Sequence, residues 1–354
     1  MCKAATLIGI DLAKNVFHIH SVDNKGNQIK ALKLSRHKLE EYLHRSQPVI
    51  VAMEACASSH FWGRLCMSLG HEVRLVSPQF VKPFVKSNKN DRNDARAICE
   101  AALRPDMHFV PAKTVEQQAV LSLHRIREVL IGQRTATINQ LRGLLSEFGL
   151  PTPVGRSGLY KILPTLLEEL SELSPGFLVT CISQQWVHLQ QLEQHINNVT
   201  HQIEAHARQS DVAYRLQTIP GIGPITASAL DASIGNARQF RAGRHLAAWL
   251  GLVPRQHSTG GKPVLLGTSK RGDCYLRQLF VHGARAVISV AQRNEGKRDK
   301  TITGWLSRKH INVAVVAMAN RNARIAWAII VHERTYDAQF REELAGRLLA
   351  RKDE

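Results

Sequence analysis

The first 80 residues alternate between apolar runs of strand length and amphipathic segments, in one fixed order. Three runs separated by turn residues, over 6–13, 16–23 and 28–35, predict a meander of three strands. The elements expected after the meander are a helix, a strand, a helix, a strand and a helix, over 36–46, 49–54, 58–69, 72–78 and from 90 onward. This order predicts a mixed α/β domain built on one sheet.

Acidic residues stand at particular places in this order. Asp11 interrupts the first apolar run, Glu54 ends the fourth strand, and Asp91 and Asp94 open the last helix. The element order is that of a ribonuclease H-like domain, in which the first and fourth strands lie side by side. Asp11 and Glu54 are therefore expected to converge at the edge of the sheet. Asp91 and Asp94 are three residues apart and share one helix face.

Four carboxylates brought together repel one another unless divalent cations lie between them. Mg²⁺ prefers hard oxygen ligands, and two such ions about 4 Å apart can activate an attacking oxygen and stabilise a leaving one. The pattern therefore predicts Mg²⁺ at Asp11, Glu54, Asp91 and Asp94. Each residue also has a simpler explanation: Asp11 as a turn cap, Asp91 as a favourable charge at a helix N-terminus, and Asp94 as a solvated charge.

The charge balance predicts a polyanionic partner. The formal net charge is +18 and the pI is near 10.0. The excess is concentrated in residues 241–354, which hold 21 Lys and Arg against 9 Asp and Glu. Phosphate contacts from such side chains supply salt-sensitive affinity without sequence information, and no recognition-helix pattern for reading bases is present.

Other classes of protein are disfavoured. No run approaches roughly eighteen apolar residues, so we expect no transmembrane helix and no membrane partner. Asp11 and Lys14 interrupt the first apolar run, so we expect no signal peptide. The six cysteines show neither CxxC nor zinc spacing with His, which predicts reduced, mostly buried thiols of a cytoplasmic protein, without a disulfide or structural metal cluster.

The middle of the chain, about 115–208, predicts two long amphipathic helices. Apolar residues recur at helical spacing from 121 to 145, and after the break at 151–153 a second stretch over 183–207 carries a heptad-like seam. Two such helices around a loop favour an antiparallel coiled-coil arm that makes a dimer contact. A helical bundle that packs on its own domain fits the pattern equally well.

Residues 214–235 predict a helix, a tight turn containing Gly221 and Gly223, and a second helix. Glycine lets a backbone approach a phosphate closely, and the N–H groups at the start of the second helix can bind its oxygens. This is the helix-hairpin-helix pattern of DNA binding without sequence specificity. Such hairpins also serve as plain packing units.

A second chemical centre is predicted around the Ser-Thr-Gly-Gly sequence at 258–261. A serine on a glycine-containing loop can reach a phosphate, and nearby cations can stabilise the developing charge. The cations in question are Arg255, Lys262, Lys270, Arg271 and Arg277. Because the sequence shows no base for this serine, the loop also fits a flexible turn.

Together these motifs resemble a known family. GIDLAK around Asp11, MEAC around Glu54 and KNDRNDARA around Asp91 and Asp94 are similar to the DEDD motif of the IS110/IS1111 insertion-sequence transposases. Their N-terminal domain is similar to the Holliday-junction resolvase RuvC. The stretch 258–272 resembles the family's transposase-domain motif, whose serine attacks DNA and holds it as a covalent phosphoserine. The resemblance covers nearly the whole chain.

The resemblance implies a DNA transposase or recombinase that cuts and rejoins strands through a 5′-phosphoserine-type link. It implies Mg²⁺ at the four carboxylates, guidance by a noncoding bridge RNA, and a homodimer or tetramer in which two protomers complete one active site. It also implies action on bacterial nucleoid DNA. The expected domains are a RuvC-like domain over 1–115, a helical coiled-coil region over 116–208 and a transposase domain over 209–354.

The position of the family serine depends on the direction of alignment. Aligned back from SKRG it falls on Ser258, and aligned forward from GLVP it can fall on Thr259. We favour Ser258, since a primary hydroxyl is less hindered. The main alternative function is a RuvC-like metal-dependent DNA junction endonuclease, which leaves 258–272 without a role. A noncatalytic nucleic-acid-binding protein is a third possibility.

Overall fold

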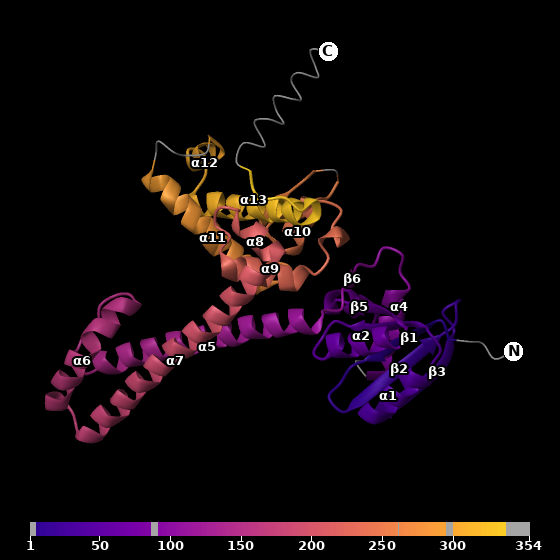
Figure 1. Cartoon of the computed structure of the whole chain (residues 1–354), viewed down its shortest axis with the longest axis horizontal. Helices are drawn as coiled ribbons and strands as arrows, with labels where there is room; N and C mark the ends of the chain where they lie inside the picture. Colours follow the sequence, from indigo (N-terminus) through magenta and orange to yellow (C-terminus); the bar gives the residue numbers. More distant parts are fainter. Residues whose placement is uncertain (1–4, 86–90, 261, 295–299, 338–354) are drawn as a thin grey trace, which may run out of the picture. The chain divides into compact units, whose positions relative to one another are not determined.

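The computed structural model of the chain describes residues 5–85, 91–260, 262–294 and 300–337, apart from the side chains of residues 91, 92 and 300. By its internal contacts the chain divides into two compact units, 1–118 and 119–354. Figure 1 labels helices of both units and strands of the first.

The first unit is built on a single mixed sheet. Its strands are β1 (Leu7–Asp11), β2 (Val16–Val22), β3 (Gln28–Ser35), β4 (Ile50–Glu54), β5 (Glu72–Val76) and β6 (Phe109–Val110). They lie in the order β3-β2-β1-β4-β5-β6, in which β1 is antiparallel to β2 and parallel to β4. The predicted meander and the predicted neighbours β1 and β4 are thus confirmed. The short edge strand β6 was not expected.

Helices cover both faces of this sheet. They are α1 (Arg36–Arg45), α2 (Ser59–Ser68), α3 (Pro78–Val81), η1 (Lys82–Phe84) and α4 (Asp91–Ala102). Because side chains alternate between faces, Ile8 and Ile10 of β1 pack with Leu39 of α1 and Trp62 of α2. Leu7 faces the opposite side, where the core is shared with α4.

The second unit is mainly helical. Its elements are α5 (Val115–Ser146), α6 (Arg156–Leu173), α7 (Gly176–Gln209), α8 (Asp211–Gln217), α9 (Pro224–Ile234), η2 (Ala237–Gln239), α10 (Gly243–Trp249), β7 (Pro254–Gln256), β8 (Leu265–Thr268), α11 (Cys274–Arg293), α12 (Lys300–Leu306) and α13 (Ile311–His332). The strands β7 and β8 form an antiparallel hairpin. Residues 295–299, in the middle of the RNEGKRDK sequence at 293–300, lie outside the described residues.

The arm formed by α5, α6 and α7 has one helix more than the sequence predicted. The two long helices are present, but a loop was expected where α6 lies, and α7 begins at Gly176 rather than near Ser183. Leucines on one face of α6 join residues of α5 and α7 in a shared core. These α6 residues are Leu159, Leu163, Leu166 and Leu170. The arm is therefore a three-helix structure.

The C-terminal part of the second unit packs around α13. This helix is long and apolar enough to cross a membrane by length and composition alone, although it carries Arg321 and Arg324. In the structure it packs against α10 and α11, and its buried residues belong to the largest core cluster. Burial in that core accounts for its apolar composition.

The cysteines are less buried than predicted. Cys66 and Cys99 are buried and Cys56 is partly buried, whereas Cys181 and Cys274 are exposed. Burial raises the pKa of Cys66 and of Cys99 to about 12. All five described cysteines are free thiols.

Candidate functional site

The two carboxylates borne on strands lie at the same edge of the sheet. β1 and β4 are parallel neighbours, and their last paired residues immediately precede Asp11 and Glu54. Alternation places Asp11 on the face of Leu7 and Glu54 on the face of Ala52. Leu7 and Ala52 both pack in the cluster that contains α4. Both carboxylates therefore belong to the α4 face of the sheet, and their convergence agrees with the sequence prediction.

Helix α4 approaches β1 so closely that only glycine fits at position 9. A Cβ atom at Gly9 would lie 2.5 Å from Sγ of Cys99 and 2.6 Å from the carbonyl oxygen of Ala95. The Cys99 thiol also donates a hydrogen bond, at 3.1 Å, to the carbonyl oxygen of His20 in β2. Gly9, which is two residues before Asp11, thus allows α4 to pack closely against β1.

The direction of α4 brings its first turn towards the same edge. Leu103, one residue beyond α4, lies against Gly26 in the turn after β2. Since β2 is antiparallel to β1, this turn lies near the start of β1, and the first turn of α4 lies towards Asp11. Asp94 is in this first turn and is partly buried. Asp91 begins α4, and its side chain lies outside the described residues.

The electrostatics of Cys56 reflect the shared environment of Asp11 and Glu54. The pKa of Cys56 is raised, first by burial and then by the negative charges of Glu54 and Asp11. Both carboxylates therefore act on one thiol. Among the described side chains, which do not include that of Asp91, no three His, Cys, Asp or Glu residues come together as a metal site.

Ser258 follows β7 in the hairpin that β7 and β8 form. Beyond the pairing of β7 with β8, Thr259 and Lys262 form a bridge nearer the tip. The Ser258 hydroxyl oxygen accepts hydrogen bonds from the side-chain amide of Gln256 at 2.9 Å and from the backbone N–H of Val264 at 3.4 Å. Ser258 and Thr259 are both exposed. The hairpin presents an accessible hydroxyl in a defined orientation.

The base of this hairpin is fixed to the following turn by contacts that require glycine. Gly251 and Gly272 have φ values of +71° and +84°. A Cβ atom at Gly251 would overlap the carbonyl oxygen of Arg271, and one at Gly272 would overlap that of Trp249. The Lys270 N–H also donates to the carbonyl oxygen of Gly251 at 3.3 Å. The GLVP and SKRG segments, which gave different alignments of the serine, are therefore in direct backbone contact.

The cations predicted around Ser258 fall into two groups. Four of them are exposed near the hairpin and its base: Arg255, Lys262, Lys270 and Arg271. Arg277 is partly buried, and its Nη1 donates to the carbonyl oxygens of Leu250 at 3.2 Å and of Arg271 at 3.1 Å. The guanidinium of Arg277 thus tethers the turn that carries Arg271.

Comparison with known proteins decides the family. A DEDD transposase model of the IS110 type matches residues 8–149, and a model described as transposase IS116/IS110/IS902 family matches residues 213–299. A probable family 20 transposase of Pseudomonas aeruginosa is 49% identical over 330 residues, which cover 93% of this chain and 98% of that protein. This chain belongs to the IS110 family of transposases.

Two insertion-sequence relatives are similar over comparable lengths. The transposase for IS1328 of Yersinia enterocolitica is 46% identical, over 92% of this chain and 96% of that protein. The transposase for IS1111A of Coxiella burnetii is 42% identical, over 94% of this chain and 92% of that protein. The chain is thus an insertion-sequence transposase, an enzyme that acts on DNA, as the sequence motifs predicted.

The helix-hairpin-helix of this IS110-family transposase has the predicted geometry, with α8 and α9 on either side of the turn. Gly221, at φ +88°, packs against α11, since a Cβ atom there would lie 2.7 Å from the carbonyl oxygen of Gly283. Packing alone thus accounts for Gly221. Gly223 is the N-cap of α9 and has open space at its Cβ position. Gly223 is the member of the pair that a phosphate can approach.

A buried polar cluster in the transposase was not predicted from the sequence. Nδ1 of His124 lies 2.9 Å from the hydroxyl of Tyr275, and Nε2 lies 3.2 Å from the hydroxyl of Ser228. Burial, together with the nearby charges of Arg127 and His206, lowers the pKa of His124 to about 4. A neutral His124 therefore joins α5 to α9 and α11. The partners of His124 are 104 and 151 residues away in the chain. The sequence indicated the cluster only by placing a histidine among the apolar residues of a predicted helix.

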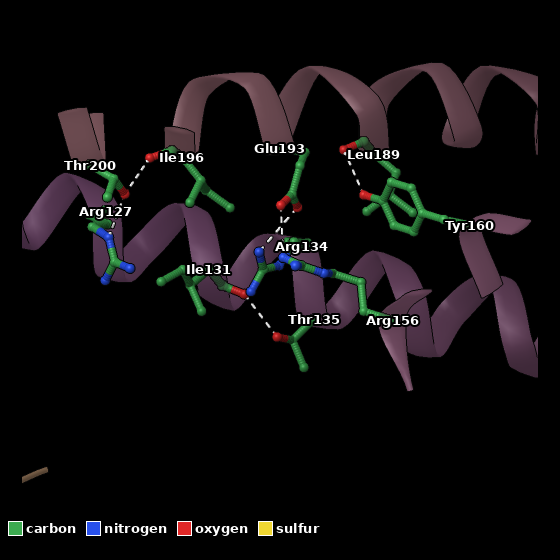
Figure 2. Close-up of polar contacts among 10 residues, drawn as sticks. All are labelled: Arg127, Ile131, Arg134, Thr135, Arg156, Tyr160, Leu189, Glu193, Ile196 and Thr200. Atoms are coloured by element: carbon green, nitrogen blue, oxygen red, sulfur yellow. Dashed lines mark hydrogen bonds and ion pairs between the residues drawn. The ribbon is translucent and has the colours of Figure 1, made fainter. Parts of the chain in front are cut away.

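The arm of the transposase also holds polar contacts that periodicity did not reveal. Figure 2 shows Glu193 of α7 between Arg134 of α5 and Arg156 of α6, at 3.1 and 2.7 Å. Farther along, Nε of Arg127 donates to the hydroxyl of Thr200 at 2.8 Å. These contacts fix how the arm helices face one another.

Proposed function

We propose that this transposase cuts and rejoins DNA through Ser258. The Ser258 oxygen attacks the scissile phosphorus, and the bond from phosphorus to the 3′ oxygen breaks. A 5′-phosphoserine ester and a free 3′ hydroxyl result, with the serine proton released to solvent and a proton taken up by the 3′ oxygen. In rejoining, a 3′ hydroxyl attacks the phosphoserine, and Ser258 is regenerated.

The hairpin geometry is the observation that carries this proposal. The Ser258 hydroxyl is exposed and oriented by Gln256 and Val264, so a phosphodiester can approach it. The exposed cations Arg255, Lys262, Lys270 and Arg271 can stabilise the added negative charge of the pentavalent transition state. Arg277 contributes by holding the turn at 271 rather than by contacting DNA.

The edge of the sheet that carries Asp11 and Glu54, called the carboxylate edge below, supports a role for Mg²⁺. Asp11 and Glu54 offer hard oxygen donors at one sheet edge, which suits this ion, and the start of α4 brings Asp94 and the backbone of Asp91 towards it. Bound there, Mg²⁺ would stabilise negative charge on phosphate oxygens. We propose that these four residues hold it and that the unit around them is a RuvC-like, ribonuclease H-like domain over about 1–115.

The rest of the chain is proposed to bind nucleic acid and to assemble the enzyme. The helical region 116–208 would make contacts between copies in a dimer or tetramer. In the transposase domain, 209–354, the N–H groups after Gly223 would bind DNA phosphates. A noncoding bridge RNA would choose the DNA sequence, which fits the lack of a base-reading helix pattern in the sequence. The setting would be the bacterial cytoplasm, on nucleoid DNA.

The test is a search for protein covalently attached to DNA. Purified full-length protein is incubated with DNA ends of its element, the element's noncoding RNA and Mg²⁺, and then denatured and run on a gel. The proposal predicts a DNA-linked band that is lost in Ser258→Ala, kept in Thr259→Ala and lost in Asp11→Ala. A band lost only in Thr259→Ala would move the nucleophile by one residue.

Two other results would give the protein a different function. Cleavage without a linked band, unaffected by Ser258→Ala but lost in Asp11→Ala, would identify a RuvC-like junction endonuclease. Binding without any cleavage, with Mg²⁺ acting only by screening charge, would identify a noncatalytic nucleic-acid-binding protein.

A further inference from the structure

A cleft of about 710 Å³ lies beside the base of the Ser258 hairpin. One wall comes from the hairpin strands and the segment before them, including Pro254 and Leu266, and the other comes from α12 and α13. This volume is within the range of about 300–1,000 Å³ that is typical of small-molecule and nucleotide sites. None of the motifs described above uses the cleft.

The lining combines an aromatic ring, guanidinium groups and apolar side chains. Trp305 of α12 lines the cleft and is partly buried, and Arg321 and Arg324 of α13 line it as well. Among the described residues that line the cleft, none is acidic. Aromatic rings stack on nucleobases of any sequence, and guanidinium groups pair with phosphate oxygens. A cationic or purely apolar ligand would not pair with the guanidinium of Arg324.

A polar group on the same wall is already positioned by the protein. The side-chain amide of Asn320 donates to the carbonyl oxygen of Leu252 at 3.1 Å, which orients its oxygen as an acceptor within the lining. Leu252 directly precedes the hairpin segment, so this bond also links α13 to the hairpin base. The aromatic, cationic and amide groups of the cleft are thus carried on elements that pack together.

We propose that this cleft binds one unpaired nucleotide of a DNA strand, with its base against Trp305 and its phosphate at Arg324. The choice of DNA rests on the proposed function of Ser258, because β8 forms the cleft wall and its partner β7 leads to that serine two residues after Gln256. Since Pro254 of the cleft wall is four residues from Ser258, a strand whose phosphate reaches Ser258 would bring a base a few nucleotides away to the cleft. Because the base has to leave the stack, the cleft should bind distorted or unwound DNA more tightly than an intact duplex.

The test compares two single strands that differ only in their bases. Octathymidylate and an abasic octamer carry equal numbers of phosphates, so the ratio of their affinities for the full chain isolates base binding from charge. Wild type is expected to bind octathymidylate about tenfold more tightly. Trp305→Ala should reduce that ratio several-fold, and Trp305→Phe should keep most of it.

Two further variants separate stacking from folding and from charge. Ala317→Phe fills the cleft from α13 without removing a core side chain, and it should also reduce the ratio. Arg324→Ala should weaken both octamers and lower the salt slope by about 0.7, leaving the ratio nearly unchanged. The control is Phe177→Ala, which removes an aromatic side chain that is 74% exposed on the arm and should leave the ratio unchanged.

The proposal fails if Trp305→Ala and Ala317→Phe both retain the wild-type ratio. A Trp305-dependent ratio that appears with octauridylate but not with octathymidylate would overturn the assignment to DNA. Ser258→Ala is expected to keep the affinity ratio of the two octamers. The proposal for the cleft and the proposal of phosphoserine chemistry can therefore be refuted independently of each other.

Discussion

Glu193 of α7 lies between two arginines of the other arm helices, with its Oε2 3.1 Å from Nη1 of Arg134 and its Oε1 2.7 Å from Nη1 of Arg156. The Glu193 and Arg134 side chains are only 23% and 17% exposed. A partly buried guanidinium that loses its carboxylate keeps its desolvation penalty without compensation. Glu193 therefore contributes more to the stability of the arm than a carboxylate in a surface ion pair would.

We expect Glu193→Ala to lower the free energy of unfolding of the protein by about 1–2 kcal/mol. Urea unfolding followed by circular dichroism measures the change. Glu169→Ala is the matched control, because Glu169 is an exposed carboxylate on α6, and its loss should change stability by less than about 0.5 kcal/mol. Equal effects of the two substitutions would contradict the buried ion-pair interpretation.

Gly9→Ala should displace α4 from β1, since its Cβ would clash with Cys99 and with the backbone of Ala95. Overpacking of this kind costs about 1–3 kcal/mol, and activity should fall because α4 carries Asp94. Gly132→Ala is the opposite case, as its site in α5 is open and alanine favours the helix by up to about 1 kcal/mol. Thermal unfolding of the pair should show shifts of opposite sign.

His124 should make stability depend on pH. Its pKa is about 4 in the folded protein and near 6.5 when unfolded, so the unfolded chain binds the extra proton first as pH falls. The contribution of neutral His124 is fully present above about pH 6.5 and is lost between about pH 6.5 and 4, at ~3 kcal/mol in all. Urea midpoints measured across this range should fall more steeply for wild type than for His124→Gln. Parallel curves would show that His124 does not titrate in this way.

Substitution of Arg277 should reduce the reaction, whereas substitution of Arg255 should reduce the salt dependence of DNA binding. Arg277→Ala frees the carbonyls of Leu250 and Arg271, so we expect about a tenfold loss of DNA-linked product with an unchanged salt slope of DNA binding. Arg255→Ala removes an exposed cation and should lower that slope by about 0.9. Filter binding over a series of salt concentrations distinguishes them, and a reduced slope in Arg277→Ala would instead place that guanidinium on a phosphate.

Mg²⁺ should stabilise the folded protein through the carboxylate edge. A ligand that binds only the folded state raises the melting temperature by mass action. Millimolar Mg²⁺ is therefore expected to raise the melting temperature of wild type and to have little effect on Asp11→Asn or Glu54→Gln. EDTA should remove the effect. A wild-type melting temperature that does not respond to Mg²⁺ would argue against binding at this edge.

The sheet and the meeting of Asp11 with Glu54 could be predicted because the information is local. Strand-length runs, turn residues and their order determine which strands are neighbours, and strand alternation then determines the faces. The direction of α4 could not be predicted in this way. It depends on contacts such as Gly9 with Cys99, which join residues that are far apart in the chain.

Helix α6 was missed although its sequence carries the signal. Leu159, Leu163, Leu166 and Leu170 follow helical spacing, but Pro164 lies inside the helix and the Pro151–Pro153 break precedes it. Prolines of this kind are ordinarily read as helix interruptions. The hairpin around Ser258 was missed for another reason: its strands are short and largely exposed, so they lack the apolar alternation that marks a strand.

The facing pairs of the arm impose a rule on how its length can change. Arg127 and Arg134 are seven residues apart on α5, and their partners Thr200 and Glu193 are seven residues apart on α7. A deletion of one residue in either helix would rotate one partner of a pair away from the other. Insertions and deletions that preserve both pairs therefore come as matched heptads in the two helices, and among relatives the arm should vary in steps of about two helical turns.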